Sequence, residues 1–213
     1  REEDPQENVR EKTLQIVEEH VDVERVKKDF PIYKVGEEHL DAIEGQEPAA
    51  KASSIAATTK AHLRPKVGQN PRYERLSERV EEVLSQWQSG QIADPEAVDA
   101  LEELEREAVA VEEEASEKGF SGAEYATYAL LHDDYGFPEK KAREVAERLC
   151  GQLDAEIDTS YEGWWKNEKA QRQVKVQIYK TLARSDTPED LEKRALGSEL
   201  RDYLIANYAQ ATT

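Results

Sequence analysis

The stretch YEGWWKNEKAQRQVKVQIYKTLAR, residues 161–184, decides how this chain is expected to fold. Two adjacent tryptophans come first, and apolar residues then recur at every fourth position. This spacing is that of one side of an α-helix. The row predicts a helix that buries one side against other helices and leaves the opposite side to solvent or to a partner. Its members are Ala170, Val174, Ile178 and Leu182.

The same stretch is basic, although the chain as a whole is strongly acidic. Residues 159–184 contain six Lys or Arg and two Glu, a net charge of +4, whereas the whole chain carries −18. One interpretation is an ordinary bundle helix with solvated lysines and a tryptophan pair that closes one end of the core. The other is that the basic side and one tryptophan dock onto another macromolecule. The residues expected to make that contact are Trp164, Trp165, Lys169, Lys180 and Arg184.

Helical spacing extends outward from this stretch, which predicts an all-α fold. An apolar stripe runs from Tyr73 to Trp87, and Asp94-Pro95 has the pattern of a helix start. Ser121 and Glu124 form a capping-box pattern, and a hitch is expected at Gly197 in the last helix. Residues 71–213 are therefore expected to form a helical bundle. Residues 1–70 contain few large apolar residues and are expected to be a partly extended connector that needs support from a neighbour.

The helix expected from Asp94 carries an acidic run that has no sign of chemistry. Residues 94–118 contain eleven acidic and two basic groups, a net charge of −9. Carboxylates become chemically useful when burial or close pairing shifts their pKa values, and the pattern gives no indication of burial. We therefore expect this run to be a solvated face rather than a metal site or an acid–base site.

Composition and motifs argue against several functional classes. Phosphate binding needs clustered cations, and only residues 159–184 offer them. The single cysteine, Cys150, suits a reducing cytoplasm and is expected to be a small buried hydrophobe. No stretch approaches the ~20 apolar residues of a membrane span, and the chain has no Gly-rich phosphate loop or nucleophile motif. We expect no catalytic, cofactor-binding or metal-binding residue here. The start at Arg1 and the lack of Met suggest a piece of a longer protein.

Four stretches, taken in order, resemble the C-terminal region of the restriction (R) subunit of type I restriction–modification enzymes. Residues 10–34 look like the segment that leaves the second helicase lobe, and residues 71–84 are similar to a helix with the pattern Tyr-x-x-Leu-Ser-Glu-Arg-Leu-Glu-Glu. Residues 118–125 resemble a Gly- and Ser-containing break, and residues 157–170 resemble a tryptophan turn before a basic helix. The chain departs from the family in its acidity and in its double tryptophan, which bear on the docking face.

The resemblance implies a role in assembly. The full subunit of that family is an ATP-dependent DNA translocase and site-specific deoxyribonuclease, whose ATP- and Mg-dependent parts would lie upstream of these residues. This chain would be a non-catalytic module that joins the motor subunit to the methyltransferase and specificity subunits, and it would reach DNA only through that cytoplasmic complex. Two alternatives stay open: a helical module that grips DNA phosphates, and a stand-alone helical protein-interaction domain.

Overall fold

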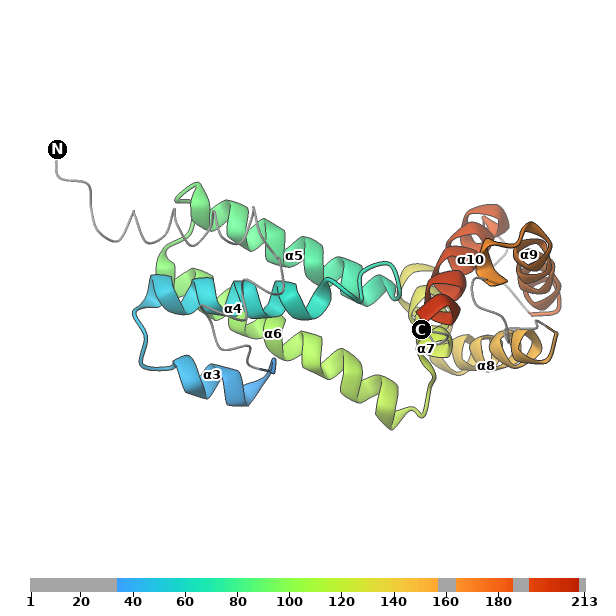
Figure 1. Ribbon diagram of the computed structural model, residues 1–213, viewed down its shortest axis with the longest axis horizontal. Coiled ribbons are helices and arrows are strands. Elements are labelled where there is room, and N and C mark those ends of the chain that lie inside the picture. The colour runs from blue at the N-terminus through green and yellow to red at the C-terminus, as the bar shows by residue number, and fades with distance from the viewer. Residues whose placement is uncertain (1–33, 157–163, 186–191, 211–213) are drawn as a thin grey trace. The chain divides into compact units, whose positions relative to one another are not determined.

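The computed structural model describes residues 34–156, 164–185 and 192–210 (Figure 1). For residues 156, 164 and 210 it describes the backbone but not the side chain. This described part is all-α, as predicted, and contains no strand. Residues 1–33 of the expected connector lie outside the described residues, and residues 34–70 are described and contain two helices. The α-helices are α3 (Glu37–Ile43), α4 (Pro48–Leu63), α5 (Pro71–Gln88), α6 (Asp94–Glu117), α7 (Gly122–Ala129), α8 (Glu139–Glu156), α9 (Glu168–Ala183) and α10 (Lys193–Gln210). A π-helical turn, η1 (Leu130–Asp134), continues α7, and a 3-10 turn, η2 (Trp164–Lys166), precedes α9.

The chain divides into two compact units. The first contains the described residues up to Val67 together with Tyr73–Glu113, and the second contains Gly68–Arg72 and the described residues from Glu114 onward. Sequence analysis places a boundary at residues 70 and 71 instead, with a connector before it. The difference arises because α3 and α4 contribute buried residues to the same core as α5 and α6, so residues 37–63 belong to that core.

The first unit is held together by a core to which α3, α4, α5 and α6 all contribute large apolar side chains, and α4 adds small ones. Ala52 and Ala56 of α4 have no exposed surface, so this helix lies close to its neighbours at these positions. Trp87 is also fully buried, and its indole N–H donates to Asp94 Oδ1 at 2.7 Å. That bond ties the end of α5 to the start of α6.

One residue of α6 corrects the expected solvated acidic face. Glu105 is fully buried, and its Oε1 accepts a hydrogen bond from the backbone N–H of Gly36 at 2.7 Å. Both of its carboxylate oxygens lie close to Nδ1 of His39, which is also fully buried, at 2.9 Å and 3.0 Å. A buried charge needs such partners because an isolated one would be expensive to desolvate. Other acidic residues of α6, such as Glu103, are exposed, as expected for a solvated face.

The second unit is a ring of four helices, α7 to α10. Each packs against two others in the order α7, α8, α9, α10 and back to α7. The capping box predicted at Ser121 is present: its hydroxyl accepts from the Glu124 N–H at 3.2 Å, and its own N–H donates to Glu124 Oε2 at 2.7 Å. Helix α10 runs through Gly197 without a break, so the hitch expected there is wrong.

Candidate functional site

Helix α9 carries the surface that the sequence singles out. The apolar row predicted from the sequence is buried: Ala170, Val174, Ile178 and Leu182 are each at most 7 % exposed. Thr181, on the same side, donates from Oγ1 to Gln152 Oε1 of α8 at 2.8 Å. The ring of Tyr179 packs against Gly197 of α10. These contacts fix the rotation of α9 about its own axis, and its other side therefore faces outward.

The turn before α9 is fixed by polar contacts. The side chain of Asn167 caps the helix, because its Oδ1 accepts from the N–H of Lys169 at 2.8 Å and of Ala170 at 3.4 Å. Gln171 donates from Nε2 to the backbone oxygen of Trp165 at 2.7 Å, which ties η2 to the first turn of α9. The basic side chains at the start of the helix therefore project from an ordered backbone.

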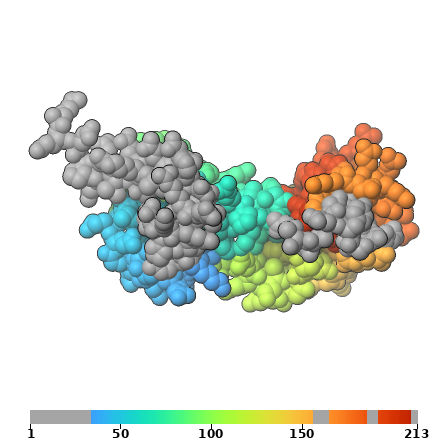
Figure 2. All heavy atoms as spheres, in the orientation of Figure 1, coloured from blue at the N-terminus to red at the C-terminus, as the bar shows by residue number. Residues whose placement is uncertain are grey.

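The charged residues on the outward side of α9 and in its flanking residues are almost all cations. Between residues 164 and 185 there are six basic residues and one acidic residue, Glu168, a net charge of +5. All six basic side chains are exposed, and they form what we call the α9 basic surface: Lys166, Lys169, Arg172, Lys175, Lys180 and Arg184. In Figure 2 the atoms of this segment are orange and contribute to the visible outer surface of the second unit.

The α9 basic surface differs from the other cations because six charges without a local ion pair lie together in one segment, whereas cations such as Arg148 and Arg194, which also have no ion pair with a described residue, belong to no such segment. None of the six has an ion pair with any residue that the structure describes. Elsewhere ion pairs are frequent: Lys51 Nζ lies 2.7 Å from Glu102, Lys60 Nζ lies 2.6 Å from Glu81, and Arg106 Nε lies 2.8 Å from Glu37. Cations left unpaired in an acidic chain are available for a partner that brings negative charge.

The structure places the five predicted contact residues as follows. Lys169, Lys180 and Arg184 are exposed members of the α9 basic surface. Trp165 is half-buried in η2. The backbone of Trp164 also lies in η2, but its side chain is outside the described residues. Whether these residues contact a partner stays a prediction.

Sequence reasoning missed one feature of this surface, an exposed valine in its middle. Val176 is 44 % exposed, although Val174 is buried. A helix turns by about 200° in two residues, so the side chain two positions after a buried one points the other way. The Val-Lys-Val sequence at 174–176 contained that signal.

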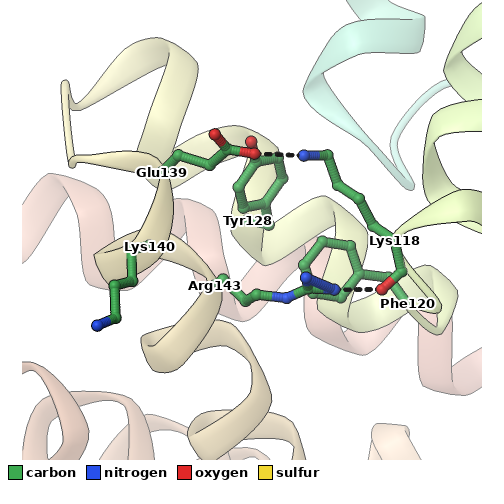
Figure 3. Close-up of a pocket in the computed structure, with 6 residues that line it drawn as sticks. All are labelled: Lys118, Phe120, Tyr128, Glu139, Lys140 and Arg143. Carbon is green, nitrogen blue, oxygen red and sulfur yellow. Dashed lines mark hydrogen bonds and ion pairs between the residues drawn. The ribbon is translucent and has the colours of Figure 1, made fainter.

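A second surface feature is a hollow of about 220 Å³ between α7 and the start of α8 (Figure 3). Arg143 lies over the ring of Phe120, 4.6 Å from its centroid, and Lys118 lies 5.2 Å from the ring centroid of Tyr128. Lys118 also pairs with Glu139, and Arg143 donates to the backbone oxygen of Lys118. Lys118 and Arg143 are already engaged by these contacts, so of the cations that line the hollow only Lys140 is left for a charged ligand.

The described residues show no reactive constellation. Burial raises the pKa of the Cys150 thiol to about 12, so this thiol is protonated near neutral pH and is a poor nucleophile. In the described ranges, no group of three or more His, Cys, Asp or Glu side chains is arranged to hold a metal ion. No described helix is both long enough and apolar enough to span a membrane.

Comparison with known proteins assigns the chain to a family. A family model described as "Type I restriction enzyme HindI endonuclease subunit-like, C-terminal" matches residues 6–201. This match places the chain among the helical domains of restriction enzymes. The chain belongs to the family of C-terminal domains of type I restriction enzyme endonuclease subunits.

The chain is also similar to part of one curated protein. The chain is similar to the putative type I restriction enzyme MjaIXP endonuclease subunit of Methanocaldococcus jannaschii, with 26 % identity over 155 residues. The matched stretch covers 69 % of this chain but 14 % of that protein, so the chain spans only a small part of the relative's length. No solved structure matches the chain at a significant level.

Proposed function

We propose that this chain is the docking module of a type I restriction endonuclease subunit, and that it joins the motor subunit to the methyltransferase–specificity core. In this proposal the ATP- and Mg-dependent translocation and cleavage of DNA belong to other parts of the subunit, and the chain reaches DNA only through the cytoplasmic complex. The family assignment supports the setting. The observation that carries the docking role is the α9 basic surface, whose cations have no ion pair with any described residue.

Charge reversal on α9 tests the docking role. In the endonuclease subunit that carries this chain, Lys169→Glu combined with Lys180→Glu should slow association with the purified methyltransferase–specificity core by about tenfold, because rim charges act mainly on the association rate. Surface plasmon resonance gives this rate. A matched control is Arg148→Glu with Arg194→Glu, which reverses two exposed cations on α8 and α10 and should leave the rate nearly unchanged. An equal response of the two double variants would remove α9 from the docking role.

The six clustered cations also favour a second candidate, a module that grips DNA phosphates. Each phosphate contact contributes a slope of about −0.9 to the dependence of log K on log salt, so several contacts on α9 would make duplex binding fall steeply with salt. Titrating the full chain with a mixed-sequence duplex at several salt concentrations distinguishes the candidates. A steep slope that Lys169→Glu with Lys180→Glu reduces would favour DNA gripping. Absence of binding at low salt would reject it.

A further inference from the structure

The centre of the α9 basic surface is apolar. Val176 is 44 % exposed, and Val67 at 42 % is the only other large apolar side chain of comparable exposure in the described part of the chain. Arg172 and Lys180 lie four residues before and after Val176, so both are its neighbours on the helix surface. Lys169 lies two turns before it on the same side. The exposed valine is thus flanked along the helix by exposed cations, and its neighbours three residues before and after are Gln173 and Tyr179.

This arrangement has the anatomy of a protein interface. Protein interfaces combine an apolar centre that is buried on association with a charged rim that stays partly hydrated. Contacts to nucleic acid phosphates are made by charged and polar groups and require no apolar centre. On a phosphate-binding helix, a valine at this position would stay exposed to water and contribute nothing to binding.

We infer that α9 binds an acidic protein surface that has an apolar side chain to pack against Val176, with carboxylates around that side chain that pair with Lys169, Arg172 and Lys180. The inference rests on the proposed function for the idea that α9 is a docking element, and it adds the chemistry of the partner. The partner's carboxylates would complement the three cations, which have no ion pair with any residue in the described ranges. Val176 would supply the apolar anchor.

Charge at larger distance disfavours two other occupants of this surface. A second copy of the chain carries −18, as does the first, so two copies repel each other. The second unit contains 15 basic and 19 acidic residues, a net charge of −4 that already includes the basic segment. Within a Debye length, about 10 Å at 0.1 M salt, this net negative charge opposes the approach of a nucleic acid, and at larger distances it is screened. A protein with a local patch of carboxylates needs cations only at contact distance.

Two designed peptides test the inference without the methyltransferase–specificity core. One is a helical peptide with a leucine among glutamates, and the other has serine in place of the leucine. The full chain should bind the leucine peptide about tenfold more tightly in fluorescence anisotropy, because burial of the leucine accounts for the difference. Val176→Asp should abolish this preference. Val67→Asp, a matched change at an equally exposed valine in the first unit, should retain it.

The outcomes separate this inference from the proposed function. Equal affinity for the two peptides, binding of neither, or an unchanged preference in Val176→Asp would overturn the inference, whatever the methyltransferase–specificity core does. Binding of a DNA duplex but of neither peptide would likewise overturn it and assign the surface to nucleic acid. The chain could instead fail to bind the methyltransferase–specificity core while keeping its preference for the leucine peptide and the dependence of that preference on Val176. This result would refute the proposed function and leave the partner chemistry of α9 supported.

Discussion

At the scale of the residue, the buried pair of Glu105 and His39 joins two polar side chains in the interior of the first unit. Both side chains are fully buried, and the Glu105 carboxylate also accepts from the backbone N–H of Gly36. Removing one member of a buried ionic or hydrogen-bonded pair costs more than the pair contributes, because the remaining group stays buried without its partner. The pair therefore links α3 to α6, and loss of either side chain would leave the other buried without its partner.

Glu105→Ala should lower the free energy of unfolding of the first unit by about 3–5 kcal/mol, the usual cost of breaking a buried pair. Urea denaturation followed by tryptophan fluorescence measures it in a Trp164→Phe, Trp165→Phe background, since the remaining Trp87 lies in the same core. Glu103→Ala, an exposed neighbour on the same helix, should change that free energy by less than about 0.5 kcal/mol. Similar losses in the two variants would show that Glu105 is not a structural anchor.

The burial of Glu105 also marks a limit of prediction from sequence. The acidic run on α6 has the composition of a solvated face, and most of the pattern is satisfied by that interpretation. The exception depends on His39, which lies 66 residues earlier in the chain. Helical periodicity reports contacts within one helix, and no local pattern indicates which distant polar group will meet a given carboxylate.

At the scale of the element, α9 shows what periodicity can predict. The buried row from Ala170 to Leu182 follows from four-residue spacing alone, and the structure confirms each of its members. Gly197 on α10 is different. A glycine inside a helical pattern suggests an interruption, yet here it makes room for a neighbouring helix. A Cβ at this position would lie 3.0 Å from Cζ of Tyr179, and that tertiary contact is invisible in the sequence of α10.

Gly197→Ala should therefore destabilise the second unit, by about 1–3 kcal/mol, which is typical of overpacking. Gly151→Ala is a matched control on α8, because a Cβ there meets nothing within 4 Å. It should stabilise the unit by up to about 1 kcal/mol, since alanine is the better helix former. Cys150, the single cysteine and a buried one, reports on this unit: the urea midpoint of its labelling by a thiol reagent should fall in Gly197→Ala and rise in Gly151→Ala. Equal midpoints would contradict the tight contact.

At the scale of the whole molecule, the charge is distributed unevenly between the two compact units. The second unit carries −4, so the remaining residues, which contain 14 basic and 28 acidic groups, carry −14 of the total of −18. Composition gives the total charge of the chain but not how that charge is divided between the two units. The division depends on the fold, because residues 68–72 belong to the second unit although α4 and most of α5 belong to the first. Most of the surplus acidic charge thus belongs to residues outside the second unit.

This excess of like charge should make the protein more stable as salt is added. Raising the ionic strength from about 0.01 M to about 1 M shortens the Debye length from about 30 Å to about 3 Å, which removes repulsion among the surplus carboxylates. Salt also weakens exposed ion pairs such as Arg106–Glu37, but each exposed pair contributes only about 0–1 kcal/mol. We therefore expect relief of repulsion to dominate and the Tm, followed by circular dichroism, to rise with NaCl.

A charge-neutral variant distinguishes this screening from a general effect of salt on burial of apolar surface. Glu103 and Glu113 are exposed, belong to the first unit, and have no ion pair with any residue in the part of the chain that the structure describes. Replacing both with Gln should raise the Tm at low salt, and the advantage should shrink toward zero at high salt because the repulsion it removes is then already screened. A constant advantage at every salt concentration would point to helix propensity instead. A wild-type Tm that falls as NaCl is added would mean that the ion pairs outweigh the surplus negative charge.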